Sequence, residues 1–152
     1  QTVLLYSLTR PDLNVPSGYD FVNREPVEIQ EAGATGFWDL LVDMQDGQLV
    51  FIPPGALGID SDVMVLPMTG MSFDEVLEAP EDSTLYIRDQ PIPAEVGTTY
   101  ILRTHEGQSD FGIPCVFWGK LETTEVHPAA ETVVFIYDVS PLCDDRGLVP
   151  TG

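Results

Sequence analysis

The chain has few of the residues that most functional motifs require. Its 152 residues include two cysteines, two histidines and only one lysine. Cysteine and histidine at zinc-ligand spacing are missing, and no glycine-rich phosphate loop or nucleophile elbow occurs. No apolar run approaches the roughly 20 residues that a membrane-spanning helix needs. We therefore expect a non-enzymatic protein with no catalytic residues, no cofactor, no bound metal and no direct membrane span.

The scarcity of cations leaves a formal charge of −19, because six Lys and Arg oppose 25 Asp and Glu. Nucleic acid is a poor partner, since its binding requires Lys and Arg to displace counterions, and anionic lipid headgroups repel such a chain too. The acidity is either a solvated surface that keeps the protein apart from its neighbours or a complement to a basic partner. We expect a protein partner, with a basic surface, and no nucleic acid.

The two cysteines fall at matching positions on the arms of an expected β-hairpin. The arms are residues 115–126 and 132–143, and a turn centred on Ala129 opposes residues whose numbers sum to 258. Cys115 and Cys143 meet that condition, and opposed residues lie about 4.5 to 5.5 Å apart at Cα, within reach of a disulfide. The alternative is two free thiols in a cytosolic core.

Side-chain alternation along both arms supports the same register. Leu121, Phe135 and Tyr137 carry odd numbers, whereas Lys120 and Asp138 carry even ones. Because successive side chains point to opposite faces of a strand, the odd-numbered face is expected to be core and the even-numbered face polar surface.

A disulfide indicates an oxidising compartment. The chain opens at Gln1 and not at Met, which fits a mature exported protein, although a cloned fragment would look the same. We therefore expect an extracytoplasmic location, periplasmic or secreted.

Turn signals separate short apolar runs throughout the chain. We expect strands over residues 19–23, 27–30, 37–43, 48–52, 63–66 and 98–104 in addition to the two hairpin arms. One short helix is expected over 72–78, where Ser72 and Glu75 form a capping box. Many short strands with one short helix predict a single all-β domain over residues 1–152, an antiparallel β-sandwich or flattened barrel.

Five short segments, in this order, resemble those of a broad group of exported bacterial β-sandwich proteins. They are Tyr19-Asp20-Phe21-Val22-Asn23, Phe37-Trp38-Asp39-Leu40, Phe73-Asp74-Glu75-Val76, residues 97–104 and Gly119-Lys120-Leu121. The nearest named members of the group are haem-capturing lipoproteins of the HmuY type, so the resemblance implies a sandwich fold and export. The chain departs from the group by inserting residues 108–114 and by lacking a lipid-anchor cysteine.

The resemblance implies haem held between two axial histidines, and this chain has only His105 and His127. An antiparallel arrangement places His105 near the base of the C-terminal hairpin and His127 at its tip, roughly 30 Å away. An axial pair needs about 4 Å. We therefore interpret both residues as exposed turn histidines.

Several groups of acidic residues allow other chemistry. Residues 60–62, 81–82 and 144–145 are candidate calcium ligands or, equally well, solvated loops. A carboxylate pair for glycoside cleavage needs only two acids about 5 to 10 Å apart, but nothing singles out such a pair.

Apolar residues outside the expected core form a candidate partner-binding set. Those near the N-terminus are too many for a free terminus, so that segment either adds an edge strand or docks on another chain. Those of the methionine-rich segment either fill the core or contact a partner. The candidates are Val3, Leu4, Leu5, Tyr6, Leu57, Ile59, Met64, Met68 and Met71. The terminal segments 1–16 and 141–152 are candidate docking regions.

Together these patterns predict a non-enzymatic extracytoplasmic accessory or structural subunit that docks on a larger, membrane-embedded protein complex. An electron-transfer or photosynthetic complex is one host that the charge and the compartment suggest. The alternative is a small-ligand, haem-type binding protein of the periplasm or cell surface.

Overall fold

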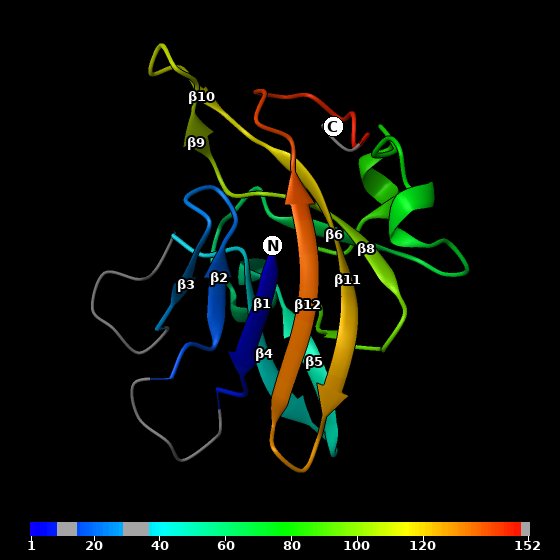
Figure 1. Ribbon diagram of the computed structural model, residues 1–152. Coiled ribbons are helices and arrows are strands. Elements are labelled where there is room, and N and C mark those ends of the chain that lie inside the picture. The colour runs from blue at the N-terminus through cyan, green and yellow to red at the C-terminus, as the bar shows by residue number, and fades with distance from the viewer. Residues whose placement is uncertain (9–14, 29–36, 150–152) are drawn as a thin grey trace.

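The computed structural model describes residues 1–8, 15–28 and 37–149, and it is an all-β fold (Figure 1). One five-stranded antiparallel sheet has the order β1 (Thr2–Tyr6), β12 (Thr132–Val139), β11 (Trp118–His127), β8 (Thr99–Arg103) and β6 (Met64–Met68). The second has the order β3 (Glu25–Val27), β2 (Gly18–Asp20), β4 (Leu40–Gln45), β5 (Gln48–Ile52) and β7 (Ile92–Pro93). The expected antiparallel sandwich is therefore confirmed.

The main core lies between the two sheets. Its largest side chains are aromatic, and their rings meet edge to face or at a tilt: Tyr19, Phe21, Phe51, Tyr100, Phe135 and Tyr137. The hydroxyl groups of Tyr19 and Tyr137 hydrogen-bond to each other across the core at 2.6 Å. The odd-numbered residues of β12 and Leu121 of β11 face this core, as the alternation predicted. Beyond Thr123 the alternation of β11 is reversed, because the even-numbered Val126 packs against the core while Glu125 and His127 are exposed.

The register of the C-terminal hairpin follows the predicted sum over most of its length. Pairs from Gly119↔Val139 to Thr123↔Phe135 all sum to 258, and a bulge after Thr123 shifts the tip by one residue. The bulge arises because one strand carries an extra residue there.

The predicted disulfide between Cys115 and Cys143 is present, with the two Cα atoms 5.7 Å apart. The cysteines nevertheless lie beyond the paired part of the hairpin. Cys115 belongs to β10 (Pro114–Cys115), which pairs with β9 (Gly107–Gln108), and Cys143 follows the end of β12.

The outer face of the first sheet is covered, which the alternation did not predict. A second apolar cluster on that face unites Met64, Val76, Ala79, Tyr86, Ile101, Trp118 and Leu148. The even-numbered Lys120 is fully buried beneath this cover, so the expectation of a polar surface there is wrong at the base of the hairpin.

The helix expected over 72–78 is a single 3-10 turn, η2 (Phe73–Glu75). Its capping box is present as predicted, between Ser72 and Glu75. The turn ends at once because Val76 adopts an extended backbone and is buried in the outer cluster. Two further 3-10 turns are η1 (Pro54–Leu57) and η3 (Ser83–Leu85).

Several strand boundaries differ from the prediction. β4 begins at Leu40 and not at residue 37, because Asp39 turns inward to accept backbone hydrogen bonds. β2 ends at Asp20, where a turn leads to Arg24 with a φ of 58°. Strand 27–30 is replaced by β3, which ends at Val27, and residues 29 and 30 lie outside the described part of the chain.

The described parts of both terminal segments pack against the rest of the chain. β1 is an edge strand paired with β12, which confirms that alternative for the N-terminal segment. At the other end, the amide of Leu148 donates to the carbonyl of Leu77 at 2.8 Å, and the amide of Ala79 donates to the carbonyl of Arg146. Residues 9–14 and 150–152 of the predicted docking regions lie outside the described residues.

Candidate functional site

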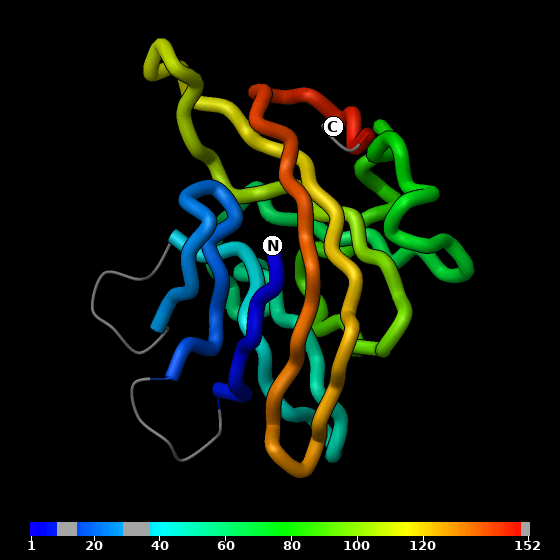
Figure 2. The backbone as a smooth tube through the Cα atoms, viewed as in Figure 1, coloured from blue at the N-terminus to red at the C-terminus, as the bar shows by residue number. Residues whose placement is uncertain are grey.

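The β9–β10 hairpin lies at one end of the sandwich (Figures 1 and 2). A buried polar cluster and the disulfide lie at its base. The hairpin starts after β8 and returns into β11. Just before its first strand lies His105, and its last residue is the disulfide-bonded Cys115. Both connections of the hairpin to the body are therefore fixed by side chains.

His105 belongs to a buried cluster with two aspartates from the other sheet. Its Nε2 atom lies 2.9 Å from Oδ1 of Asp20 and 4.0 Å from Oδ2 of Asp39. The two oxygens of Asp39 accept the backbone amides of His105 and Phe21, each at 2.6 Å. The expectation that His105 is an exposed turn residue is therefore wrong, because these contacts draw it inside.

The surroundings of the His105 ring favour the imidazolium. Nδ1 faces the carbonyl of Glu106 at 3.1 Å, and Nε2 faces the carboxylate of Asp20. Both partners are acceptors, so both ring nitrogens donate. Burial lowers the pKa of His105, but the hydrogen bond to Asp20 and the charges of both aspartates outweigh it and hold that pKa above its usual value.

The two aspartates of this cluster titrate differently. Burial raises the pKa of Asp39 to about 7 despite the opposing influence of His105. Burial also acts upward on the pKa of Asp20, but hydrogen bonds from His105 and Asn23 outweigh it, so that pKa lies below its usual value. The two carboxyl groups face the same histidine, but their different environments shift their pKa values in opposite directions.

The ligand atoms of Asp20, Asp39 and His105 lie within 4.8 Å of one another, which is close enough for a shared metal ion. However, a doubly protonated imidazole has no lone pair for a metal, and the carboxylates already accept backbone and side-chain donors. We assign the cluster a bracing role, since it ties the start of the hairpin to the second sheet.

His127 lies far from this cluster. It is the last residue of β11, whereas Trp118, the first residue of the same strand, pairs with Arg103 two residues before His105. Its ring is exposed and contacts Glu125 at 3.0 Å. The two histidines therefore lie near opposite ends of the C-terminal hairpin (β11–β12), as predicted. The geometry gives no support to an axial pair.

Among the described residues, Lys120 is buried as well as His105. Its Nζ atom donates to the carbonyls of Phe73 and Val76, at 2.6 and 2.9 Å, and lies 4.4 Å from the centre of the Phe73 ring. Burial lowers the pKa of Lys120, although Asp74 and Asp138 oppose the change. The ammonium group thereby satisfies carbonyls that the short turn η2 leaves without helical partners.

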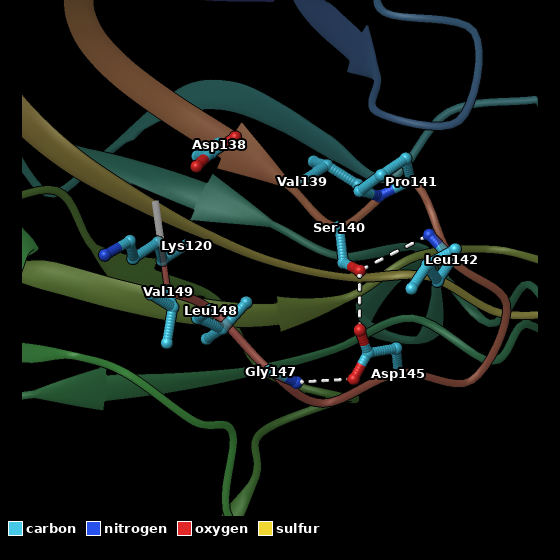
Figure 3. A pocket seen from close by; sticks show the side chains of 10 residues that line it. All are labelled: Lys120, Asp138, Val139, Ser140, Pro141, Leu142, Asp145, Gly147, Leu148 and Val149. Atoms are coloured by element: carbon cyan, nitrogen blue, oxygen red, sulfur yellow. Dashed lines mark hydrogen bonds between the residues drawn. The ribbon is translucent and has the colours of Figure 1, made fainter. Parts of the chain in front are cut away.

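A pocket of about 180 Å³ lies between the end of β12 and the C-terminal segment (Figure 3). Ser140 and Asp145 face each other in it, with the hydroxyl donating to the carboxylate at 3.3 Å. The other oxygen of Asp145 accepts the amide of Gly147 at 3.0 Å. Small-molecule sites usually measure about 300 to 1,000 Å³, and these polar atoms hold the tail against the sheet.

A second pocket, of about 230 Å³, also borders the end of β12 and is lined by Phe21, Arg24 and Phe117 among others. Arg24 crosses from the β2–β3 turn and donates to the carbonyl of Val139 at 3.1 Å. This volume too is below the usual range for small-molecule sites.

The acidic groups considered as calcium ligands have local roles where their contacts are described. Asp82 caps η3 by accepting the amide and hydroxyl of Thr84. Asp144 accepts the amide of Val116 at 3.3 Å, next to the disulfide. These contacts favour the loop alternative for both residues.

The predicted partner-binding residues divide by burial. Val3 and Leu5 fill the main core and Met64 fills the outer cluster, so the prediction is wrong for these three side chains. Leu4 and Leu57 are exposed. The remaining candidates are half-buried: Tyr6, Ile59, Met68 and Met71.

Sequence reasoning missed the most exposed apolar side chain of the described surface, Phe111, which lies at the tip of the β9–β10 hairpin. The available signal was the insertion of residues 108–114, with its Asp110-Phe111-Gly112 turn, between two expected strands. Turns are dominated by Gly, Pro, Asn, Asp and Ser, so a large apolar residue within a turn is a signal of an exposed side chain.

No protein-family model and no curated protein matches this chain in sequence comparisons. The resemblance to HmuY-type lipoproteins stays a prediction. Within residues 1–8, 15–28 and 37–149, no helix has the length and apolar character to cross a membrane.

Proposed function

We propose that this chain is a non-enzymatic extracytoplasmic accessory subunit that docks on a larger assembly. It binds a basic surface of that assembly. The observation that carries the proposal is a surface on which acidic charge and large apolar side chains occur together. Interfaces combine an apolar centre with a polar rim, and charge of one sign steers the encounter and sets its orientation.

Folding buries cationic side chains, so the surface of the protein is more acidic than its amino-acid composition. Lys120 is fully buried, and Arg103 and Arg146 are half-buried while donating to backbone carbonyls. Few cations remain to neutralise the exposed acids, so a basic partner is attracted over a Debye length of about 10 Å at moderate salt.

Large apolar side chains are exposed on the same surface. They are Leu4, Phe37, Leu57, Leu77, Leu85, Val96, Phe111, Ile113, Leu142 and Val149. Single exposed apolar residues are ordinary, but three of these, Phe111, Ile113 and Leu142, belong to the disulfide-linked end of the sandwich. The disulfide itself supports an oxidising compartment.

Native gel filtration of the source membranes, gently solubilised, tests the proposal. The chain is expected to co-elute with a large assembly at low salt and to be released at about 1 M salt, where the Debye length falls to roughly 3 Å. Purified protein run alone provides the control for self-association. Elution near its own 16.7 kDa at both salt concentrations contradicts the proposal.

A further inference from the structure

The β9–β10 hairpin projects beyond both sheets and ends in an apolar tip (Figures 1 and 2). Phe111 is 90 % exposed there and Ile113 is 61 % exposed. A phenylalanine that contacts so little of its own chain contributes almost nothing to folding, because stabilisation follows the apolar area removed from water.

The tip that presents Phe111 is held in one conformation. The hydroxyl of Ser109 accepts the amides of Phe111 and Ile113, each at 3.2 Å. The amide of Ser109 donates to the carbonyl of Ile113, and the amide of Gly112 donates back to the carbonyl of Ser109, each at 2.9 Å. Gly112 has a φ of +75°, which suits glycine.

The base of the hairpin is equally constrained. A Cβ atom added at Gly107 would come within 2.8 Å of Val22 and 3.0 Å of Phe117, so the backbone lies tightly against the body. The bracing cluster holds the chain at His105 and the disulfide holds it at Cys115. A segment that is ordered before it binds loses little conformational entropy on binding.

The charge around the tip is of one sign. Residues 106–115 contain Glu106 and Asp110 but no lysine, arginine or histidine. Anionic lipid repels such a segment, and a second copy of the chain carries the same acidic tip. Leu142, 61 % exposed and adjacent to the disulfide, extends the apolar surface toward the base.

We infer that the hairpin is the docking element of this protein, with Phe111 as the anchor that enters an apolar pocket on a protein partner whose rim carries lysine or arginine. Asp110 and Glu106 pair with that rim, and Ile113 and Leu142 pack around the pocket. This inference rests on the proposed accessory role, and it names the surface and the chemistry of the partner. Aromatic anchors that fill pockets usually dominate the energy of an interface.

The test compares Phe111→Ser with Val96→Ser in the full, oxidised chain, by the native co-elution described above. Val96 is 61 % exposed and lies between β7 and β8, away from the hairpin, so it controls for the loss of one exposed apolar side chain. We expect Phe111→Ser to weaken co-elution by roughly tenfold or more, and Val96→Ser to behave as the wild type. Urea unfolding should show equal stability for all three proteins, because both positions are exposed.

The possible outcomes separate this inference from the proposed function. If the wild type co-elutes with an assembly and Phe111→Ser does so equally, the hairpin inference is wrong and the accessory role stands. If the wild type elutes alone, both are wrong. A photo-crosslinker at position 111 should give a discrete protein adduct that a crosslinker at position 96 does not give.

Two further measurements address other occupants of the tip. Sedimentation with phosphatidylcholine or phosphatidylglycerol vesicles should show no binding. Vesicle binding that Phe111→Ser abolishes would assign the tip to lipid and overturn the inference. A concentration-dependent dimer of the purified wild type that Phe111→Ser abolishes would overturn it in favour of a second copy.

Discussion

Replacing Asp39 with asparagine should destabilise the fold by about 1 to 3 kcal/mol. Both oxygens of Asp39 accept buried backbone amides at 2.6 Å. Asparagine keeps one acceptor and puts an NH₂ group opposite the other amide, which leaves a buried donor unsatisfied at a cost of about 1 to 3 kcal/mol.

Urea unfolding measures this loss at about pH 8, where a carboxyl with a pKa of about 7 is mostly ionised. In a thermal scan, the same loss should lower Tm by about 2 to 12 °C for a domain of this size. Asp110→Asn is the matched control, since it makes the same chemical change on the exposed hairpin tip and should stay within about 0.5 kcal/mol of the wild type. If Asp39→Asn unfolds at the same urea concentration as Asp110→Asn, the bracing role is refuted.

Three further predictions concern the other buried groups. Lys120→Met should cost about 1 to 3 kcal/mol in urea unfolding, because two buried carbonyls lose their donor; a variant as stable as the wild type contradicts the role given to the ammonium group. Replacing Cys115 and Cys143 together with alanine should cost about 3 to 4 kcal/mol, from a sequence separation of 28; unfolding of the wild type under reducing conditions should show the same loss. The folded-state pKa of His105 is raised, so its contribution to stability is full below its ordinary pKa of about 6.5 and is lost as the pH rises above that value; the raised pKa of Asp39 acts with the same sign between about pH 4 and pH 7. The urea midpoint should therefore fall with rising pH in the wild type and less steeply in His105→Gln, and equal slopes would show that the cluster does not titrate as described.

Local patterns were enough to predict the strands of the C-terminal hairpin and the meeting of its cysteines. Alternating residues fix which face of a strand is apolar, and a short turn fixes which residues oppose each other. Extending the register from Leu121 and Tyr137 outward brought Cys115 opposite Cys143, although the paired strands stop before either cysteine. The bulge after Thr123 escaped prediction but lies at the other end of the hairpin.

The buried polar groups could not be predicted in the same way. His105 reads as a turn residue because its neighbours in sequence are polar, and its partners Asp20 and Asp39 lie 85 and 66 residues away. Lys120 reads as surface because it alternates with core residues, yet the outer face of its strand is covered by the segment around η2. No pattern among neighbouring residues predicts either contact.

The sequence by itself determined the all-β class, the core-facing side of β12 and of β11 up to the bulge, and the pairing of the cysteines, since these follow from alternation and turns along neighbouring residues. Tertiary structure alone decided that the outer face of the first sheet is covered, that His105 and Lys120 are buried, and that Phe111 is left exposed at the projecting tip. The physical reason is that burial depends on which distant segments pack against a residue, and packing partners are set by the whole fold.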